Sequence, residues 1–540
     1  MTDNYFSSDT KGPALTASTI DSTPPTAPPP PTSSNPILRQ ILWHYGTTTS
    51  VRDPSQIERE RFLVGSVPFN RWCLMPAAVV IQFCCGSLYA WSVFNDPIDN
   101  AIRPGSTEKL APITFSIAVG VFGISAATMG PWLERNGPKK GALLSSTLFY
   151  LGNLISALAV HLKQMWLLYI GFGIIGGFGL GLGYISPVSS LQKWFPDRRG
   201  LAAGFAVCGF GAGSIAIGKV ILPLIAAVGL PLTFVILGSF YFVFMVSAAF
   251  VLRVPPPGYT VIATPTAQTE VNEKGGAVVQ QPVIKLTLIE SITSRDFILL
   301  YIVFFANAIF GLVVISRLAN MITDLFGYDK NAAATIVSIN GGFNLFGRIF
   351  FSTISDFVGR KVCFLFMLVI QVVVMATFNI ITSTQTYWAF LLTMFSLTAC
   401  YGGGFGVIPA FLADMFGPTN IGACHGIILT AWSIAGVGGG LVFTAVYNNM
   451  ISSGSTKSDP RTYVVNVYWI LVFVLIGLIA GVFVRTTMKD RLLPAVPGQI
   501  LRMRIFGKTV RLVNNNGMRL ETLTFEQEEA EWNQYLSQLQ

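Results

Sequence analysis

Arg348 is the residue of this sequence whose surroundings most clearly indicate chemistry, because it lies in an apolar, glycine-punctuated stretch from Asn340 to Lys361. An arginine at the depth of lipid chains costs between ~2.5 and 3.5 kcal/mol on insertion scales, so it must face protein or a water-filled cavity. Its planar fork of N–H donors suits a carboxylate better than a lysine does. The stretch therefore predicts a buried site for a small anion. A snorkelling or purely structural role for Arg348 is the alternative.

Two similar charged segments end apolar stretches of the chain. Residues 130–140 read GPWLERNGPKK, and residues 355–361 read SDFVGRK, with the aspartate eight residues after Arg348. A carboxylate at a helix end can pair with basic residues and with the N-terminus of a neighbouring helix, which would close one face of a membrane protein. Simple surface charge is the alternative. The predicted gating residues are Gly130, Glu134, Arg135, Gly137, Asp356, Gly359 and Arg360.

The composition indicates what must position these groups. Only 11% of the 540 residues are charged and 52% are hydrophobic, whereas soluble domains carry about 25% charged residues. Apolar runs of roughly 20 residues, each long enough to cross a bilayer as a helix, recur twelve times. The predicted spans are 72–94, 112–132, 141–161, 165–186, 200–226, 230–252, 297–320, 331–352, 362–383, 387–412, 421–447 and 463–485. The sequence therefore predicts an all-α, multi-pass membrane protein embedded in a lipid bilayer.

The two sets of six spans are related to each other. Glu134 and Asp356 are 222 positions apart, and five further pairs at the same places in their halves share this offset. Those pairs are Gly137 with Gly359, Lys139 with Lys361, Pro187 with Pro409, Gly200 with Gly422, and Gly204 with Gly426. A parallel repeat about an axis along the membrane normal predicts two six-helix bundles with a binding site between them near the midplane.

Lysine and arginine set the expected orientation. The loops after spans 2, 4, 6 and 8 hold twelve of them and the opposite loops hold six, so the positive-inside rule places both termini and the central loop in the cytoplasm. The net charge of +9 then reflects basic residues facing anionic lipid, and we expect no nucleic-acid partner. The expected parts are a disordered N-terminal tail and juxtamembrane segment (1–70), a first bundle (71–252), a central loop (253–296), a second bundle (297–485) and a C-terminal tail (486–540). Within them, residues 1–36 and most of 254–290 are too polar or too rich in Ser, Thr and Pro to bury a core, so we expect them to be disordered.

A further segment is the most specific in the chain. Residues 193–204 read KWFPDRRGLAAG and precede a glycine-rich stretch, Gly209 to Ser214. This resembles the hallmark of the oxalate/formate antiporter family, W-F-P-D-K/R-R-G-L-A-x-G, which belongs to the major facilitator superfamily. Residues 130–140 likewise resemble the superfamily signature G-x-x-x-D/E-R-x-G-x-K/R-K/R, with Glu134 in place of the usual Asp. The resemblance covers residues 71–485 and implies the major facilitator fold.

The resemblance also implies a site. In that family a small carboxylate is held by basic residues and enclosed by aromatic ones, and by position the span-8 arginine of the family is Arg348. Ala431 stands where the family's oxalate carrier has a second, span-11 lysine, which implies that monoanions are preferred over oxalate. Monocarboxylate transporters, a neighbouring family, carry Asp four residues before this arginine, where this chain has Asn344. The aromatic positions of the family fall on Tyr89, Tyr184, Phe210, Tyr401 and Phe405.

Three hypotheses about function follow. The first is a secondary carrier of small organic anions that works by exchange or facilitated flux, through alternating access of the two halves. The second is a proton-coupled monocarboxylate symporter, and the third is a metabolite sensor of the same fold that transports nothing. The sequence contains no nucleotide-binding loop, catalytic triad or metal motif, so we expect no enzyme activity, cofactor or metal. We expect the protein to act as a monomer, in the plasma membrane rather than in an organelle.

Overall fold

A computed structural model of the protein describes residues 35–46, 52–104, 110–257, 259, 286–505, 508–514 and 517–539. The chain forms two compact units, Met1–Thr47 and Thr48–Gln540. The described part of the first is one helix, α1 (Pro36–Gly46). Of the stretches for which the sequence predicts disorder, residues 1–34, 258 and 260–285 lie outside the described residues. All other described elements belong to the second unit.

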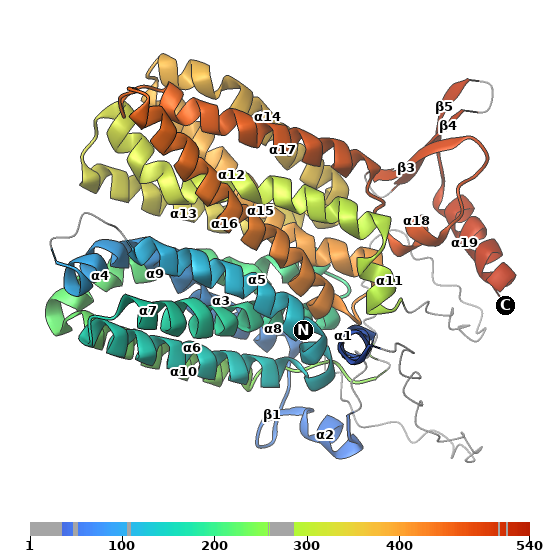
Figure 1. Ribbon diagram of the computed structural model, residues 1–540. Helices are drawn as coiled ribbons and strands as arrows, with labels where there is room; N and C mark the ends of the chain where they lie inside the picture. Colours follow the sequence, from blue (N-terminus) through green and yellow to red (C-terminus); the bar gives the residue numbers. More distant parts are fainter. Residues whose placement is uncertain are drawn as a thin grey trace. The chain divides into compact units, whose positions relative to one another are not determined.

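Six helical segments in the described part of residues 71–249 pack into a first bundle, coloured blue to green in Figure 1. In this bundle α3 packs against α9, α5 against α8, and α6 against both α8 and α10. The segments are η1–α3–η2–α4 (Arg71–Ile102), α5 (Ala111–Asn136), α6 (Pro138–His161), α7–η3–α8 (Met165–Trp194), α9 (Arg199–Val228) and α10 (Leu230–Ala249).

Six long helices from residue 295 onward form a second bundle, coloured yellow to orange in Figure 1. The short helix α11 (Leu288–Ile292) precedes them. In this bundle α12 packs against α16 and α17, and α14 packs against α15 and α17. The helices are α12 (Arg295–Phe326), α13 (Lys330–Val358), α14 (Arg360–Ser383), α15 (Tyr387–Phe416), α16 (Ile421–Ser452) and α17 (Arg461–Phe483).

Eleven helical segments of the described residues are long and apolar enough to cross a membrane, and α13 is not among them. Every fourth residue of α13 from Asn340 through Asn344 and Arg348 to Ser352 is polar, and all four are buried. Residues four apart lie on one face of a helix, so this polar stripe faces protein. With α13 as the twelfth span, the predicted all-α membrane fold with two six-helix bundles is confirmed.

Several helices run further than their apolar runs predicted. Helices α5, α13 and α15 continue through their charged ends, beyond the predicted residues 132, 352 and 412. A helix needs no apolar side chains once it leaves lipid, and it ends where a residue adopts a left-handed backbone, which glycine does at little cost. The terminating residues are Gly137 (φ 86°), Gly359 (φ 101°) and Gly417 (φ 81°).

Two spans of the first bundle change helix type midway. The first passes from α3 (Leu74–Gly86) through the 3₁₀ segment η2 (Ser87–Phe94) to α4 (Asn95–Ile102). The fourth contains the π-helical segment η3 (Tyr169–Gly176), between α7 (Met165–Leu168) and α8 (Gly177–Trp194). Such interruptions within helices often occur at functional positions. One of the predicted site residues, Tyr89, lies in η2.

Short elements precede the first span. They are α2 (Pro54–Arg59), the paired strands β1 (Phe62–Val64) and β2 (Val67–Pro68), and the 3₁₀ turn η1 (Arg71–Cys73). Arg253, just beyond α10, donates hydrogen bonds to the carbonyls of Glu60 (2.8 Å) and Phe62 (3.0 Å). Burial lowers the pKa of Arg253, and nearby Glu60 counteracts that effect. The juxtamembrane segment is therefore fixed to the end of the first bundle.

The residues after α17 fold into a small module. Its elements are α18 (Met488–Leu492), the antiparallel strands β3 (Gln499–Ile505), β4 (Lys508–Asn514) and β5 (Met518–Thr522), and α19 (Phe525–Leu539). Arg502 and Asp490 form a buried ion pair of 3.0 Å within it. Arg491 joins the module to the second bundle, because it lies 3.5 Å from Asp296 and donates a hydrogen bond to the Met415 carbonyl (3.2 Å).

The two bundles meet along two seams. In the first seam α5 packs against α16, and in the second α9 packs against α13. A Cβ at Gly426 would lie 2.0 Å from the Ala126 carbonyl oxygen, and a Cβ at Gly204 would lie 3.0 Å from the Arg348 carbonyl oxygen. These two glycines are 222 positions apart, so both copies of the repeat use the same close backbone approach.

Adding a methyl group at Gly426 should therefore open the first seam. We expect Gly426→Ala to increase the rate at which a maleimide labels Cys424, which is 1% exposed in the closed seam, by about tenfold or more, since overpacking costs roughly 1–3 kcal/mol. The measurement uses a variant in which Cys424 is the sole cysteine. Gly438→Ala, in the same helix, is the control because a Cβ added there would have no atom of the described residues within 4 Å. Equal labelling of the two variants would contradict this reading of the seam.

Candidate substrate site and latch

Arg348 lies at the centre of the contact between the bundles and is 0% exposed. Its Nε donates a hydrogen bond to Asn344 Oδ1, one turn earlier on α13, at 3.0 Å. Its Nη1 donates to the Val207 carbonyl of α9, across the second seam, at 3.0 Å. Among the described residues, its buried Nη2 has no hydrogen-bond partner. The guanidinium therefore has two neutral acceptors and one donor nitrogen still available.

Two phenylalanine rings flank the guanidinium. Arg348 Cζ lies 5.4 Å from the ring centroid of Phe210 and 4.9 Å from that of Phe405. A cation over an aromatic face gains about 0.5–2 kcal/mol, more where water is excluded. The ring of Tyr184 contacts both phenylalanines, at centroid distances of 5.6 and 6.3 Å. These aromatic side chains exclude water from the arginine on both sides.

The remaining predicted aromatics join the bundles by a hydrogen bond. The hydroxyls of Tyr89, in η2, and Tyr401, in α15, are 2.6 Å apart. Trp432 Nε1 donates a second hydrogen bond to the Tyr401 hydroxyl at 2.9 Å. All five aromatic residues that the sequence assigned to the site therefore gather around Arg348. Trp432 was missed, and its place directly after Ala431, the position of the absent lysine, was the signal that could have identified it.

Glycines allow α15 to reach this position. A Cβ at Gly402 would lie 2.2 Å from the Asn344 carbonyl oxygen, and one at Gly406 would lie 2.3 Å from that of Arg348. Because α15 packs this closely on α13, Tyr401 and Phe405, one turn apart, both face the arginine side of the seam. The Tyr-Gly-Gly-Gly-Phe segment thus positions two site residues on one helical face.

Glu134 closes one end of the first seam. Its Oε1 accepts a hydrogen bond from the backbone N–H of Gly422, in the first turn of α16, at 2.6 Å. The same oxygen accepts one from Ser189 at 3.3 Å, and Oε2 forms an ion pair with Lys193. The carboxylate belongs to the first bundle and caps a helix of the second, so its negative charge meets the positive end of the α16 dipole.

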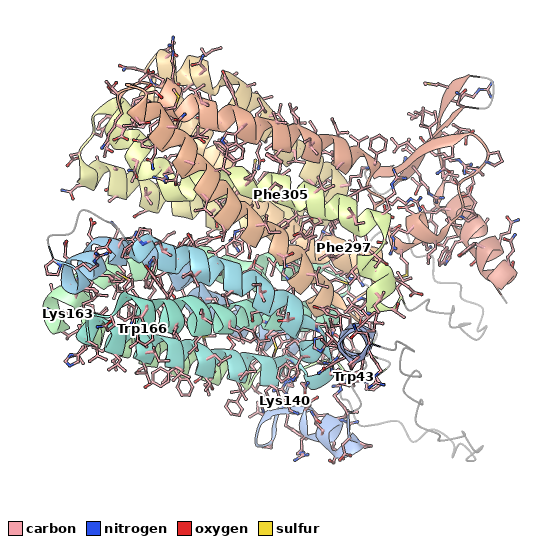
Figure 2. The ribbon with its side chains drawn as sticks, viewed as in Figure 1. Trp43, Lys140, Lys163, Trp166, Phe297 and Phe305 are labelled. Atoms are coloured by element: carbon pink, nitrogen blue, oxygen red, sulfur yellow. The ribbon has the colours of Figure 1, made fainter. Side chains whose placement is uncertain are left out.

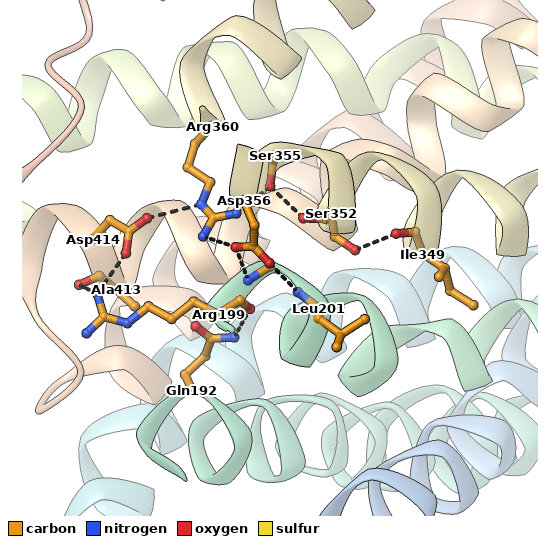
Figure 3. Close-up of polar contacts among 11 residues, drawn as sticks. Gln192, Arg199, Leu201, Ile349, Ser352, Ser355, Asp356, Arg360, Ala413 and Asp414 are labelled. Carbon is orange, nitrogen blue, oxygen red and sulfur yellow. Dashed lines mark hydrogen bonds and ion pairs between the residues drawn. The ribbon is translucent and has the colours of Figure 1, made fainter. Parts of the chain in front are cut away.

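Asp356 makes the reciprocal contact at the second seam (Figure 3). Its two oxygens accept hydrogen bonds from the backbone N–H groups of Gly200 (2.9 Å) and Leu201 (3.0 Å), in the first turn of α9. Arg360 lies 2.6 Å from the same carboxylate. Glu134 with Gly422 and Asp356 with Gly200 are therefore two copies of one contact, and each carboxylate belongs to the opposite bundle from the helix it caps.

A third carboxylate adds an ion pair between the bundles. Asp414, in the last turns of α15, lies 2.7 Å from Arg199 of α9 and 3.0 Å from Arg360 (Figure 3). We call these contacts of Glu134, Asp356 and Asp414 the latch. The sequence did not identify Asp414, because a lone carboxylate at a helix end shows no spacing pattern. Its partner Arg199 lies in the segment 193–204 that the sequence did single out.

The other predicted gating residues surround the latch. A Cβ at Gly130 would lie 2.6 Å from Ala423 Cα, so this glycine permits the approach of α5 and α16. Gly137 and Gly359 end the two helices that carry the latch carboxylates. Arg135 is half-buried in the last turn of α5. Figure 2 shows Lys140 at the same end of the first bundle and Lys163 and Trp166 at the opposite end, as the predicted alternation of loops requires.

This architecture, in which two six-helix bundles meet at a buried arginine, is that of a multi-pass membrane transporter. The family model of the Major Facilitator Superfamily matches residues 62–440, and the chain belongs to this superfamily. An uncharacterized transporter of the superfamily from Escherichia coli, YhjX, is 28% identical over 374 residues, which are 68% of this chain and 86% of YhjX. The oxalate:formate antiporter of Oxalobacter formigenes is 24% identical over 389 residues, 70% of this chain and 86% of the antiporter.

A solved structure supports the fold as well. A double tryptophan mutant of XylE superposes with a TM-score of 0.61 at 15% identity, over 76% of this chain and 94% of that chain. The family model and this likeness confirm the major facilitator fold that the sequence motifs predicted, and the antiporter relative agrees with the predicted resemblance.

Removing a latch carboxylate should shift the protein toward a state open at the latch end. We expect Asp356→Asn and Glu134→Gln to shift this equilibrium by ~1–3 kcal/mol, the usual effect of losing a charge-assisted contact, while the protein still folds. Spin labels at Lys140→Cys and Phe357→Cys report the separation of the bundles, since both positions are exposed. The native cysteine that is not buried, Cys73, is replaced.

Asp197→Asn is the matched control for the latch variants. Asp197 pairs with Arg71 at 2.9 Å, and both residues belong to the first bundle. The control therefore removes a similar ion pair without touching the contact between bundles, and its distance distribution should match the parent. Unchanged distributions in Asp356→Asn and Glu134→Gln would show that the latch does not hold the bundles together.

Proposed function

We propose that this protein is a secondary transporter of small organic anions, principally carboxylates, which it moves by exchange through alternating access of its two bundles. The observation that carries this proposal is the buried Nη2 of Arg348, which has no partner among the described residues. A fully buried positive charge costs several kcal/mol unless an anion or a dense set of hydrogen bonds compensates it. No described carboxylate lies within ion-pair distance of Arg348, whose two protein acceptors are neutral. A substrate carboxylate supplies the missing charge.

Exchange fits these residues better than proton symport. The side chain that contacts Arg348 from one turn earlier is Asn344, an amide that cannot take up or release a proton. An empty carrier then keeps an uncompensated arginine between the bundles, which disfavours its return across the membrane without an anion. The name of the Oxalobacter formigenes relative, an oxalate:formate antiporter, agrees with this mode of transport.

Alternating access follows from the distribution of contacts. At the latch end the bundles are joined by two capped helices and an ion pair, and at the centre by the Tyr89–Tyr401 hydrogen bond and by Arg348. Release of the latch would separate the seams at that end while the bundles rock about the central site. We infer from the excess of basic residues that the latch end and both termini are cytoplasmic.

We also propose a location and an oligomeric state for the transporter. The proposed location is the plasma membrane. The proposed working unit is a monomer, because one chain supplies both seams and all the predicted site residues. Neither enzyme activity nor a nucleic-acid partner is part of the proposal.

Changes at Arg348 test the substrate site. In proteoliposomes loaded with formate, we expect Arg348→Gln to abolish counterflow of labelled formate, and Arg348→Lys to reduce it at least about tenfold, because a lysine keeps the charge but loses the planar fork. Arg317→Lys is the matched control, since Arg317 also lies within a span but donates to Thr444 inside the second bundle at 2.6 Å. Wild-type rates in both Arg348 variants would make this arginine structural.

The absence of a second cation sets the charge of the preferred substrate. Ala431 is 0% exposed and adjoins Trp432 of the aromatic cluster. We expect the wild type to favour formate and acetate over oxalate, because a dianion would meet one cation only. Ala431→Lys should shift the ratio of oxalate to formate transport upward by about tenfold, the effect of roughly 1.4 kcal/mol. Ala431→Met, of similar length and uncharged, should leave the ratio unchanged. A wild type that prefers oxalate would contradict the monoanion prediction.

A further inference from the structure

His425 is a buried polar side chain that the proposed carboxylate site does not use. It lies in the second turn of α16, three residues after the latch glycine Gly422, and is 0% exposed. Neither of its ring nitrogens has a hydrogen-bond partner among the described residues. A buried donor or acceptor left unpaired costs about 1–3 kcal/mol, and native proteins pair most such groups. An apolar residue would stabilise this packing better, so histidine here indicates a missing partner.

The internal repeat places His425 at the depth of Arg348. Gly204 packs on the backbone of α13, where its Cβ would lie 3.0 Å from the Arg348 carbonyl oxygen. Its repeat mate Gly426, next to His425, packs in the same way on Ala126, the residue 222 positions before Arg348. His425 and Arg348 therefore lie at equal depth, one beside each seam.

Tyr184 connects the two groups. Its ring centroid lies 5.7 Å from that of His425, and the same ring contacts Phe210 and Phe405, which flank Arg348. The Tyr184 hydroxyl is also buried, has no hydrogen bond of normal geometry among the described residues, and interacts electrostatically with the nearby Arg348 guanidinium. Three buried polar groups with unused hydrogen-bonding capacity, one cationic and two neutral, thus surround one aromatic cluster.

We infer that His425 and Tyr184 form a second, neutral subsite that binds an oxygen function other than the carboxylate held by Arg348. This inference rests on the proposed function and narrows its substrates to short monocarboxylates that carry a hydroxyl or carbonyl group. A neutral imidazole offers one N–H donor and one acceptor nitrogen, and a phenol both donates and accepts, so the pair can satisfy either oxygen function. A site built for such hydrogen bonds rejects analogues that lack the oxygen, because its own groups then stay unpaired.

The test compares acids that differ by one oxygen function. Proteoliposomes of the full chain are assayed for uptake of labelled propionate against lactate, and of butyrate against 3-hydroxybutyrate, two pairs that place the hydroxyl at different distances from the carboxylate. We expect the wild type to favour the hydroxy acid in at least one pair by about tenfold or more. His425→Leu should bring that ratio to within about threefold of unity while propionate uptake persists. His425→Gln, which keeps a donor and an acceptor, should retain part of the preference.

Two controls separate this subsite from folding and from the arginine site. His161→Leu removes an exposed histidine at the far end of α6 and should keep the wild-type ratio. The ligand-free melting temperature of His425→Leu should equal or exceed that of the wild type, since the variant removes unpaired groups. A fall of several degrees would mean that protein groups pair with His425, which overturns the inference.

The remaining outcomes distinguish the two proposals. If uptake depends on Arg348 but His425→Leu keeps the wild-type preference, or the wild type shows no preference, the neutral subsite is wrong and the carboxylate transporter stands. If the wild type takes up none of the four acids, nor formate or acetate, the proposed function fails and the subsite falls with it.

Discussion

The structure depends on one electrostatic constraint, the burial of a guanidinium where neither water nor lipid headgroups can reach it. At this depth Asn344 and the Val207 carbonyl accept two hydrogen bonds from Arg348, and two phenylalanine rings flank its guanidinium. These partners come from both bundles. The arginine therefore ties substrate binding to the contact between bundles, because an anion that binds to it also changes what holds the seam together.

A second constraint acts at the latch end, where helix termini leave backbone N–H groups without partners. Each bundle supplies a carboxylate that caps the first turn of a helix in the other, Glu134 at α16 and Asp356 at α9. Such contacts are strong in a dry seam but have good substitutes in water, since both the carboxylate and the N–H groups are readily hydrated. The latch can therefore open without leaving a costly unsatisfied group, which a transporter requires of its gate.

Much of this arrangement was predictable from the sequence, for physical reasons. Lipid requires long apolar helices, so the twelve spans could be counted, and the 222-residue offset revealed the repeat that pairs Glu134 with Asp356. Arg348 stood out because a charged side chain costs free energy at the depth of the lipid chains. By contrast, Asp414 and His425 gave no sequence signal, since one polar residue at a helix end or among small residues fits many roles. The helix ends were placed too early because apolar runs stop where lipid stops, whereas the helices continue to Gly137, Gly359 and Gly417. The C-terminal module was missed because all three of its strands carry charged residues, which interrupt any apolar run.

The most direct test of the central claim is a map of the protein with a bound carboxylate that can be located without ambiguity. Methylselenoacetate suits this purpose, because this selenoether does not alkylate protein thiols, and anomalous scattering identifies its selenium and so fixes the direction of the molecule. The carboxylate should lie within about 3 Å of Arg348 Nη2, the normal length of a hydrogen bond, with Phe210 and Phe405 on either side. A carboxylate bound elsewhere, with Nη2 of Arg348 paired to a protein group, would contradict the claim that this arginine holds the substrate.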